Sequence, residues 1–139
     1  MPPALTPALA LDYVRELSAD VRAAVVLDAD GKLLAGPPQL AAPAQVLLAA
    51  AGSATELEIV SAAGVVCAVR SPEHAAVAVC GRFAIAGVVR QDLRAAVAAL
   101  AGRAPGSGGS AARHEDGPSD ALERAAEALI STVQRGFEA

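Results

Sequence analysis

The cysteines and histidines are the side chains of this sequence best suited to metal binding or nucleophilic chemistry. Cys67 and Cys80 flank a turn that contains His74, and His114 lies in a segment rich in Gly and Ser. Zinc requires three or four converging ligands, so this set predicts no metal site. The two cysteines fall on adjacent predicted strands, where they are either small buried thiols or, in a suitable register, a disulfide.

Two pairs of charged residues recur at regular spacing. Glu56 and Glu58 lie two residues apart on a predicted strand, and Arg90 and Arg94 lie four apart on a predicted helix. Such pairs usually form solvated surface, so we expect both to be exposed, although a lone arginine can also serve as an arginine finger. Nucleophilic catalysis needs a serine or cysteine beside a positioned base, and one histidine in a turn, without a G-x-S-x-G elbow, gives little support for it. We therefore expect no catalytic residues and no enzymatic activity.

Two glycine-containing segments are candidates for ligand binding. Residues 106–109 are rich in Gly but are followed by no lysine and preceded by no strand, so they do not form a phosphate loop. Asp28–Gly31 begins like a calcium loop but lacks the later carboxylates, and Asp-Gly is typical of a tight hairpin turn. The sequence therefore predicts no cofactor.

The composition limits the possible partners. The chain has 139 residues, 54% hydrophobic and 2% aromatic, about a quarter of them Ala, with a net charge of -4. One domain fits this length, but an Ala-rich core stabilises little, which favours oligomerisation. The sequence contains no cluster of Lys and Arg, so it does not predict a nucleic-acid or membrane-surface partner. We recognise no export signal or membrane span, since charges interrupt the apolar stretch 85–101, and so expect a cytoplasmic protein.

The first half of the chain predicts a helix, a hairpin and a second helix. Thr6-Pro7 is a typical helix start, which predicts a helix over 7–19. Strands over 23–27 and 32–36 flank the Asp-Gly turn. Pro43 begins a short helix that Gly52 is placed to end.

The next segments predict the remainder of a sheet. Alternation over 56–59 indicates an edge strand, and strands over 65–69 and 75–80 are apolar on both sides. Inner strands without a polar face must be covered by helices on both faces, which predicts an α+β fold built as an α/β/α sandwich. A helix over 85–100 completes a domain spanning 1–102.

The C-terminal part predicts one more helix. Residues 103–118 have the composition of a flexible linker, and 119–139 contain an amphipathic helix over 120–137 that Ser119 is placed to cap. This helix either folds back on its own domain or lies in a groove on a partner.

Two stretches resemble a known family. Residues 21–35 (VRAAVVLDADGKLLA) and 86–94 (AGVVRQDLR) are similar to the first hairpin and the "G-x-x-R" helix opening of the roadblock/LC7 (dynein light chain, longin-like) family, with coverage from about 8 to 102. The resemblance implies a five-stranded antiparallel sheet of profilin-like architecture. It also implies that the first and third helices cover one face and the second helix covers the other.

The resemblance further implies a function. Family members form dimers in which the middle helix meets its twin and the third strand extends the sheet, and they regulate small Ras-like GTPases or act as adaptors without active sites. Here this implies a non-enzymatic homodimeric module whose interface maps to Ala44, Leu47, Leu48, Ala51, Leu57 and Ile59. The candidate partner-binding face of the last helix is Leu122, Leu129, Ile130, Val133 and Phe137.

Two other functions fit the sequence. The chain is a structural adaptor if its last helix binds a partner whatever the nucleotide state. It is a small-molecule sensor if the Ala-rich core leaves a cavity.

Overall fold

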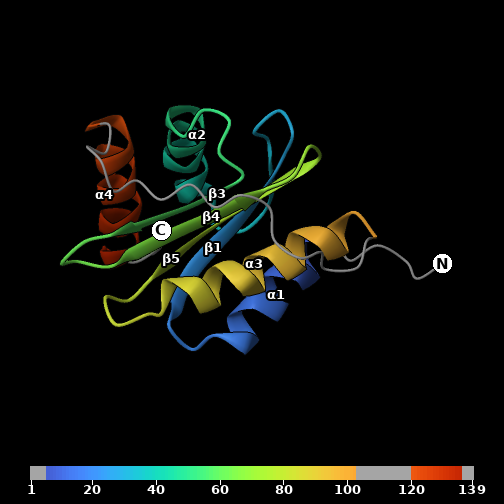
Figure 1. The fold of residues 1–139 in the computed structure, drawn as a ribbon, viewed down its shortest axis with the longest axis horizontal. Helices are drawn as coiled ribbons and strands as arrows, with labels where there is room; N and C mark the ends of the chain where they lie inside the picture. Colours follow the sequence, from blue (N-terminus) through green and yellow to red (C-terminus); the bar gives the residue numbers. More distant parts are fainter. Residues whose placement is uncertain (1–5, 103–119, 136–139) are drawn as a thin grey trace.

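A five-stranded antiparallel sheet lies between two layers of helices (Figure 1). The computed structural model describes residues 6–102 and 120–135. The elements in chain order are α1 (Pro7–Leu17), β1 (Val21–Asp28), β2 (Leu33–Ala35), the 3-10 helix η1 (Pro38–Leu40), α2 (Ala41–Ala50), β3 (Glu56–Val60), β4 (Val65–Arg70), β5 (His74–Cys80), α3 (Ala86–Leu100) and α4 (Asp120–Gln134). The predicted α/β/α sandwich is confirmed.

The predicted helix cap and hairpin turn near the N-terminal end are both present. The Thr6 hydroxyl accepts a hydrogen bond from the Leu9 N–H at 3.3 Å, which caps α1. In the β1–β2 turn, Asp28 Oδ1 accepts from the N–H groups of Asp30 and Lys32, at 2.8 and 2.9 Å. Gly31 takes a φ of 87°, which an L side chain rarely adopts, so the Asp-Gly turn is confirmed.

The second helix begins earlier than predicted. α2 starts at Ala41, so Pro43 is its third residue rather than its first. A proline is tolerated there because the N–H groups of the first turn have no partner within the helix. Gly52, with a φ of 63°, follows the end of α2 as predicted.

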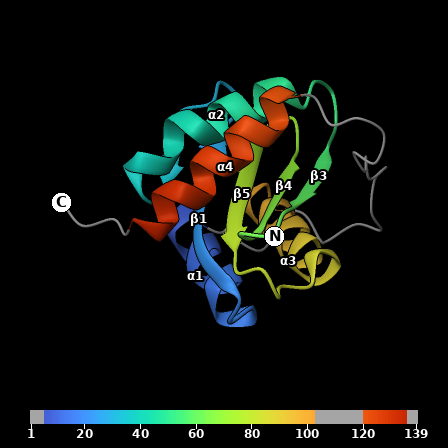
Figure 2. The ribbon, with the colours of Figure 1, turned by 90° about the vertical axis from the view of Figure 1, so that its left-hand side faces the viewer.

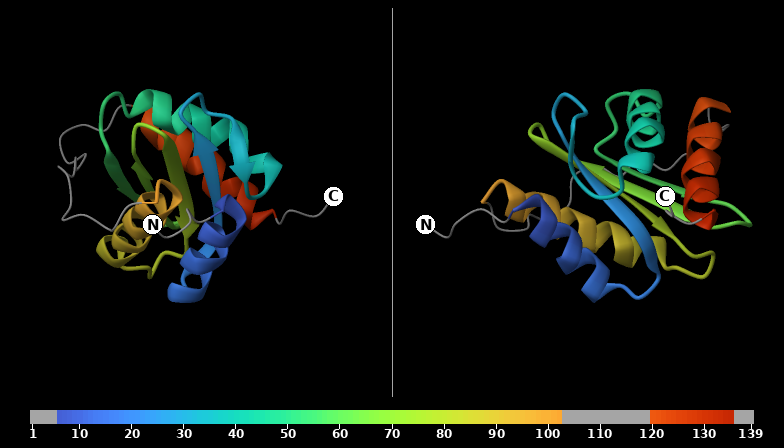
Figure 3. Two further views of the ribbon diagram at one scale, coloured as in Figure 1. Left: turned by 90° about the vertical axis from the view of Figure 1, so that its right-hand side faces the viewer. Right: turned by 180° about the vertical axis from the view of Figure 1, so that it is seen from behind.

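The strand order is β2-β1-β5-β4-β3, which places β2 and β3 at the two edges. All neighbouring strands are antiparallel, with Cys67 opposite Ala78 and Val65 opposite Cys80 between β4 and β5. Helices α1 and α3 cover one face, and α2 covers the other, as expected (Figures 1 and 3).

The fourth helix lies beside α2 on the same face of the sheet (Figure 2). Its inward side chains Leu122, Leu129 and Ile130 are buried in one apolar cluster with residues of α2, β3, β4 and β5. In the part of the chain that the structure describes, no helix has the length and apolar character to cross a membrane. The predicted linker 103–118, the predicted cap Ser119 and Phe137 lie outside the described residues.

Candidate protein-interaction surface

The outer edge of β3 is covered by no other strand among the described residues. Among the described residues β3 pairs only with β4. At the two ends of this ladder, Arg70 N–H donates to Thr55 O at 2.8 Å and Ser61 N–H donates to Gly64 O at 2.9 Å. Backbone groups alternate in direction along an antiparallel strand, so those of alternate residues, such as Glu56 and Val60, point away from β4. The backbone groups of Glu56 and Val60 are therefore placed to hydrogen-bond an added strand.

The side chain of Glu56 is buried next to this edge and does not form solvated surface. It is 3% exposed, and its carboxylate accepts from Arg94 Nε at 2.7 Å, Arg94 Nη2 at 2.8 Å and Arg90 Nη1 at 3.0 Å. Arg90 Nη2 also lies 3.4 Å from Glu58 Oε1. The expectation that both charged pairs are exposed was wrong, because the flank of α3 that carries both arginines faces the start of β3.

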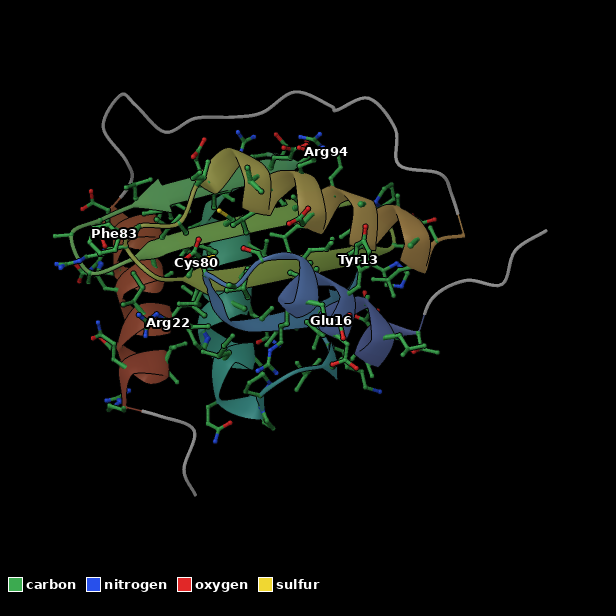
Figure 4. The ribbon with its side chains drawn as sticks, turned by 90° about the horizontal axis from the view of Figure 1, so that it is seen from below. Tyr13, Glu16, Arg22, Cys80, Phe83 and Arg94 are labelled. Carbon is green, nitrogen blue, oxygen red and sulfur yellow. The ribbon has the colours of Figure 1, made fainter. Side chains whose placement is uncertain are left out.

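The charges of this cluster support one another. The hydrogen bond from Arg94 is the main cause that lowers the pKa of Glu56, and it outweighs the desolvation that would raise it. In return, the hydrogen bond to Glu56 raises the pKa of Arg94. The bidentate contact of a planar guanidinium with a carboxylate fixes direction as well as distance, so the cluster ties α3 to the edge strand (Figure 4 labels Arg94).

The sequence gives little indication that these four charged residues lie together. Two carboxylates at i, i+2 and two arginines at i, i+4 have matching spacings on strand and helix, and each helical turn rises about 5.4 Å. Glu56 and Arg94 are 38 residues apart in the chain, so only the topology brings them together.

The predicted dimer residues lie on β3 and in or just after α2, and they differ in accessibility. Ala44, Leu47 and Leu57 are buried in the chain's own core. Leu48, Ala51 and Ile59 are only half-buried and pack at the margin of the same cluster. Exposed large apolar side chains of these two elements are Val46 on α2, 54% exposed, and Val60 on β3, 66% exposed. An incoming partner can reach the half-buried Leu48, Ala51 and Ile59 and the backbone of β3. It cannot reach the buried Ala44, Leu47 and Leu57.

The predicted partner-binding residues of α4 contact their own domain. Leu122 and Leu129 are fully buried, Ile130 is 5% exposed, and Val133 packs against the same cluster while half-buried. In this arrangement the apolar face of α4 covers the sheet beside α2.

The two cysteines are free and buried, which agrees with the prediction of small buried thiols rather than a disulfide. They lie on the α1/α3 face at diagonal positions, because Cys67 is opposite Ala78 and Cys80 is opposite Val65. Desolvation is the main cause that raises the pKa of each thiol to about 12. Both are therefore protonated at neutral pH and are poor nucleophiles.

Arg70, at the end of β4, has a positioning role that the sequence did not suggest. Its guanidinium donates to Leu48 O at 3.1 Å, to Ala54 O at 2.8 Å and to Gly52 O. Leu48 lies in the last turn of α2, where a cation is favoured, and Gly52 and Ala54 lie in the connection that follows. These contacts fix the connection from α2 to the edge strand.

A cavity of about 490 Å³ lies beside Arg70, between the β1–β2 turn, α2 and the β4–β5 turn. His74 lines this cavity, and its Nδ1 is buried without a hydrogen-bond partner. Within residues 6–102 and 120–135, no group of three or more His, Cys, Asp or Glu side chains is placed to hold a metal ion. We therefore assign no metal-binding role to the described residues of this cavity.

Comparisons with known proteins identify the fold. No family model matches the sequence, and no curated protein matches it with significant similarity. Two crystal structures of roadblock/LC7 domains from Streptomyces avermitilis match the structure, each with probability 1.00.

The first has a TM-score of 0.55 and 23% identity, and the match covers 64% of this chain and 92% of that one. The second has a TM-score of 0.59 and 13% identity, and the match covers 70% and 97%. Nearly the whole of each Streptomyces domain therefore finds a counterpart here, while about a third of this chain has none. With the sheet order and helix layers described above, these matches show that the chain has the roadblock/LC7 fold.

Proposed function

We propose that the chain is a non-enzymatic, homodimeric regulatory or scaffold module that binds a small Ras-like GTPase or a signalling complex in the cytoplasm. The observation that carries this proposal is the edge of β3, where Glu56 and Val60 direct their backbone groups away from β4 beside the Arg90–Arg94–Glu56 cluster. A rigid edge loses little conformational freedom when a second strand pairs with it.

Self-association also fits the composition of the chain. About a quarter of the residues are Ala, so burial within one copy supplies little apolar area per residue. A specific dimer removes roughly 1,200 to 2,000 Å² from water. Pairing of two β3 edges would add Val60 and Ile59 to the buried surface, since they are exposed and half-buried in one copy.

The GTPase part of the proposal follows from the fold and from the sequence resemblance to the roadblock/LC7 family. A regulator of this kind acts by positioning its partner, so it requires surfaces and no catalytic side chain of its own.

A substitution at Val60 tests the dimer without disturbing the fold. The Val60 N–H points outward, so Val60→Pro removes a donor from the edge and no hydrogen bond from the β3–β4 ladder. Val60→Thr is the matched control, because it keeps the size and branching of the side chain and keeps the N–H. We expect light scattering to show dimers for the parent chain and Val60→Thr and monomers for Val60→Pro. A parent chain that is monomeric at all concentrations would contradict the homodimer.

Leu57→Lys is unsuitable for this purpose. Leu57 is 2% exposed within its own chain, so the substitution would place a charge in the core and unfold the protein rather than separate two copies.

The proposed binding of a small GTPase is tested by affinity capture from a native lysate with GDP and, in parallel, with a slowly hydrolysed GTP analogue. A small GTPase enriched in one nucleotide state supports the regulator. The same partners in both states, without a GTPase, would favour a structural adaptor instead. An adaptor that uses the apolar face of α4 would require this helix to leave the sheet, because Leu122 and Leu129 are fully buried.

A further inference from the structure

A second cavity, of about 480 Å³, opens at the end of the sheet away from Arg70. Four segments meet there: the α1–β1 connection, the β3–β4 turn, the β5–α3 loop and the last turns of α4. Its lining residues, here called the Arg22–Arg82 pocket, are Asp20, Arg22, Ala62, Ala63, Val79, Cys80, Gly81, Arg82, Phe83, Ile130, Val133 and Gln134. Figure 4 shows Arg22, Cys80 and Phe83 at this end, beside α4.

The pocket is built from packed elements. Gly64 lies so close to β5 and α4 that an added Cβ would be 2.8 Å from Cys80 O and 3.6 Å from Ile130 Cδ1. Gly81 N–H donates to Asp20 O at 3.0 Å, which joins the β5–α3 loop to the start of β1. The C-terminal half of α4 forms one wall, so the pocket depends on the helix beyond the predicted linker.

Two arginines stand at its rim. The Arg22 guanidinium lies against the β5–α3 loop, where a Cβ on Gly81 would be 3.3 Å from Arg22 Nε. Arg82 Cζ lies 4.8 Å from the centroid of the Phe83 ring, a cation–π contact. Both arginines are exposed, and neither forms a salt bridge with a described residue. Of the lining residues only Asp20 is acidic, although the whole chain has a net charge of -4.

Apolar surface surrounds these charges. Phe83 is 80% exposed and Ile85, two residues further, is 68% exposed, while Val79, Ile130 and Val133 line the pocket itself. Exposed large apolar side chains beside a hollow are typical of an interaction site. The raised pKa of the Cys80 thiol, about 12, keeps the pocket wall uncharged there at neutral pH.

We propose that the Arg22–Arg82 pocket is a docking site for an acidic segment of a partner protein. This segment inserts one apolar side chain into the pocket and carries carboxylates on both sides of that side chain. The pocket volume lies within the range of sites that enclose a small ligand, roughly 300 to 1,000 Å³, and so accommodates one aromatic or large aliphatic side chain. Arg22 and Arg82 would pair with carboxylates on either side of it, and a planar guanidinium is suited to bidentate contact with a carboxylate.

An acidic peptide fits this surface better than an anionic membrane does. Binding to a membrane surface is strengthened by clusters of about four to eight basic residues. Here two arginines line a hollow that also contains Asp20. A concave site with few charges favours one inserted side chain over a flat lipid surface.

This inference rests on the proposed role in protein interaction, but its test needs neither a GTPase nor a dimer. The probe is a ten-residue synthetic peptide with one central Phe flanked by Glu residues. Two comparison peptides carry Lys in place of Glu, or Ala in place of the Phe. The full-length chain, labelled with nitrogen-15, is titrated with each peptide while amide shifts are followed by NMR and oligomeric state by light scattering.

We expect the acidic aromatic peptide to produce saturable shifts at the amides of Gly81, Arg82 and Phe83, and both comparison peptides to bind at least about tenfold more weakly. The charge-reversal double variant Arg22→Glu/Arg82→Glu should weaken binding by about tenfold or more. Arg15→Glu is the matched control, because Arg15 is exposed on α1 and does not line the pocket, and it should leave the affinity unchanged.

Several results would overturn the proposal. These are no saturable shift at the pocket, equal affinity for the Glu and Lys peptides, or binding only to vesicles of phosphatidylcholine with phosphatidylserine. If the double variant fails to fold, Phe83→Ser replaces it, since an exposed ring can be removed without loss of core, and it should weaken binding of the acidic aromatic peptide. A monomeric parent chain that still binds this peptide at the pocket would contradict the dimer and support the docking site.

Discussion

The two faces of the sheet are covered by different means. On one face, α1 and α3 both come from the segment that resembles the roadblock/LC7 family, and α3 alone buries Val89, Leu93, Val97 and Leu100. On the other face, α2 has ten residues and buries only Ala44 and Leu47. There α4 supplies Leu122, Leu129 and Ile130, from beyond the predicted linker.

Part of the chain has no counterpart in the two matched Streptomyces domains. The Streptomyces domains are matched over 92% and 97% of their length, yet those matches cover only 64% and 70% of this chain. A short Ala-rich α2 covers little of the inner strands, which are apolar on both sides. Here α4 completes the second layer and also forms a wall of the Arg22–Arg82 pocket.

The largest expected effect comes from removing one core leucine on each face. Leu93 on α3 and Leu129 on α4 are both completely buried. Replacing either by Ala should lower the free energy of unfolding by about 3 to 5 kcal/mol, because the substitution leaves a cavity. Urea denaturation followed by circular dichroism measures both changes.

The comparison between these two variants decides whether α4 belongs to the folded unit. Similar losses in a single transition would mean that both faces unfold together. If Leu129→Ala leaves the transition unchanged while Leu93→Ala shifts it, α4 is not docked as described. Ser131→Ala, at an exposed position of α4, is the control and should change the free energy by less than about 0.5 kcal/mol.

The next largest effect concerns the charged cluster between α3 and β3. Glu56→Gln keeps the size of the side chain but removes the charge that Arg90 and Arg94 face, and should cost about 2 kcal/mol at neutral pH. Because the pKa of Glu56 is lowered in the folded chain from an ordinary value of 4.5, its ion pair stabilises the fold above that value. This stabilisation disappears as the pH falls through the lowered pKa.

Denaturation curves at several pH values test this prediction. The parent chain should lose more stability between neutral and acidic pH than Glu56→Gln does. Glu58→Gln is the matched control, since Glu58 is less buried and its contact with Arg90 is 3.4 Å, and it should cost under about 1 kcal/mol. Equal acid sensitivity of Glu56→Gln and the parent chain would contradict the assigned role of the cluster.

Most of the fold was predictable because its signals are local. The Thr6 cap, the Asp28–Gly31 turn and the alternation in β3 each depend on neighbours in sequence, and each predicted element is present. The burial of Glu56 was not predictable in this way, since it depends on two arginines more than 30 residues further along the chain.

The position of α4 shows the same limit. Its amphipathic pattern predicted a helix with one covered face, but a pattern does not specify the surface that covers it. The dimer residues were chosen by position in the family, so those that face the sheet, such as Ala44 and Leu47, were not distinguished from the accessible Leu48 and Ala51. The Arg22–Arg82 pocket needs four segments to converge, and no single stretch of sequence contains that information.

The smallest predicted effect lies at the first turn of α1. The Thr6 hydroxyl caps this helix, whereas α2 has no side-chain cap and relies on η1 before it. Thr6→Ala should therefore cost about 1 kcal/mol and Thr6→Ser much less, because serine keeps the accepting oxygen. Urea denaturation measures both. An unchanged midpoint for Thr6→Ala would mean that the first turn of α1 is frayed in solution, so that this face depends on α3 and the remainder of α1.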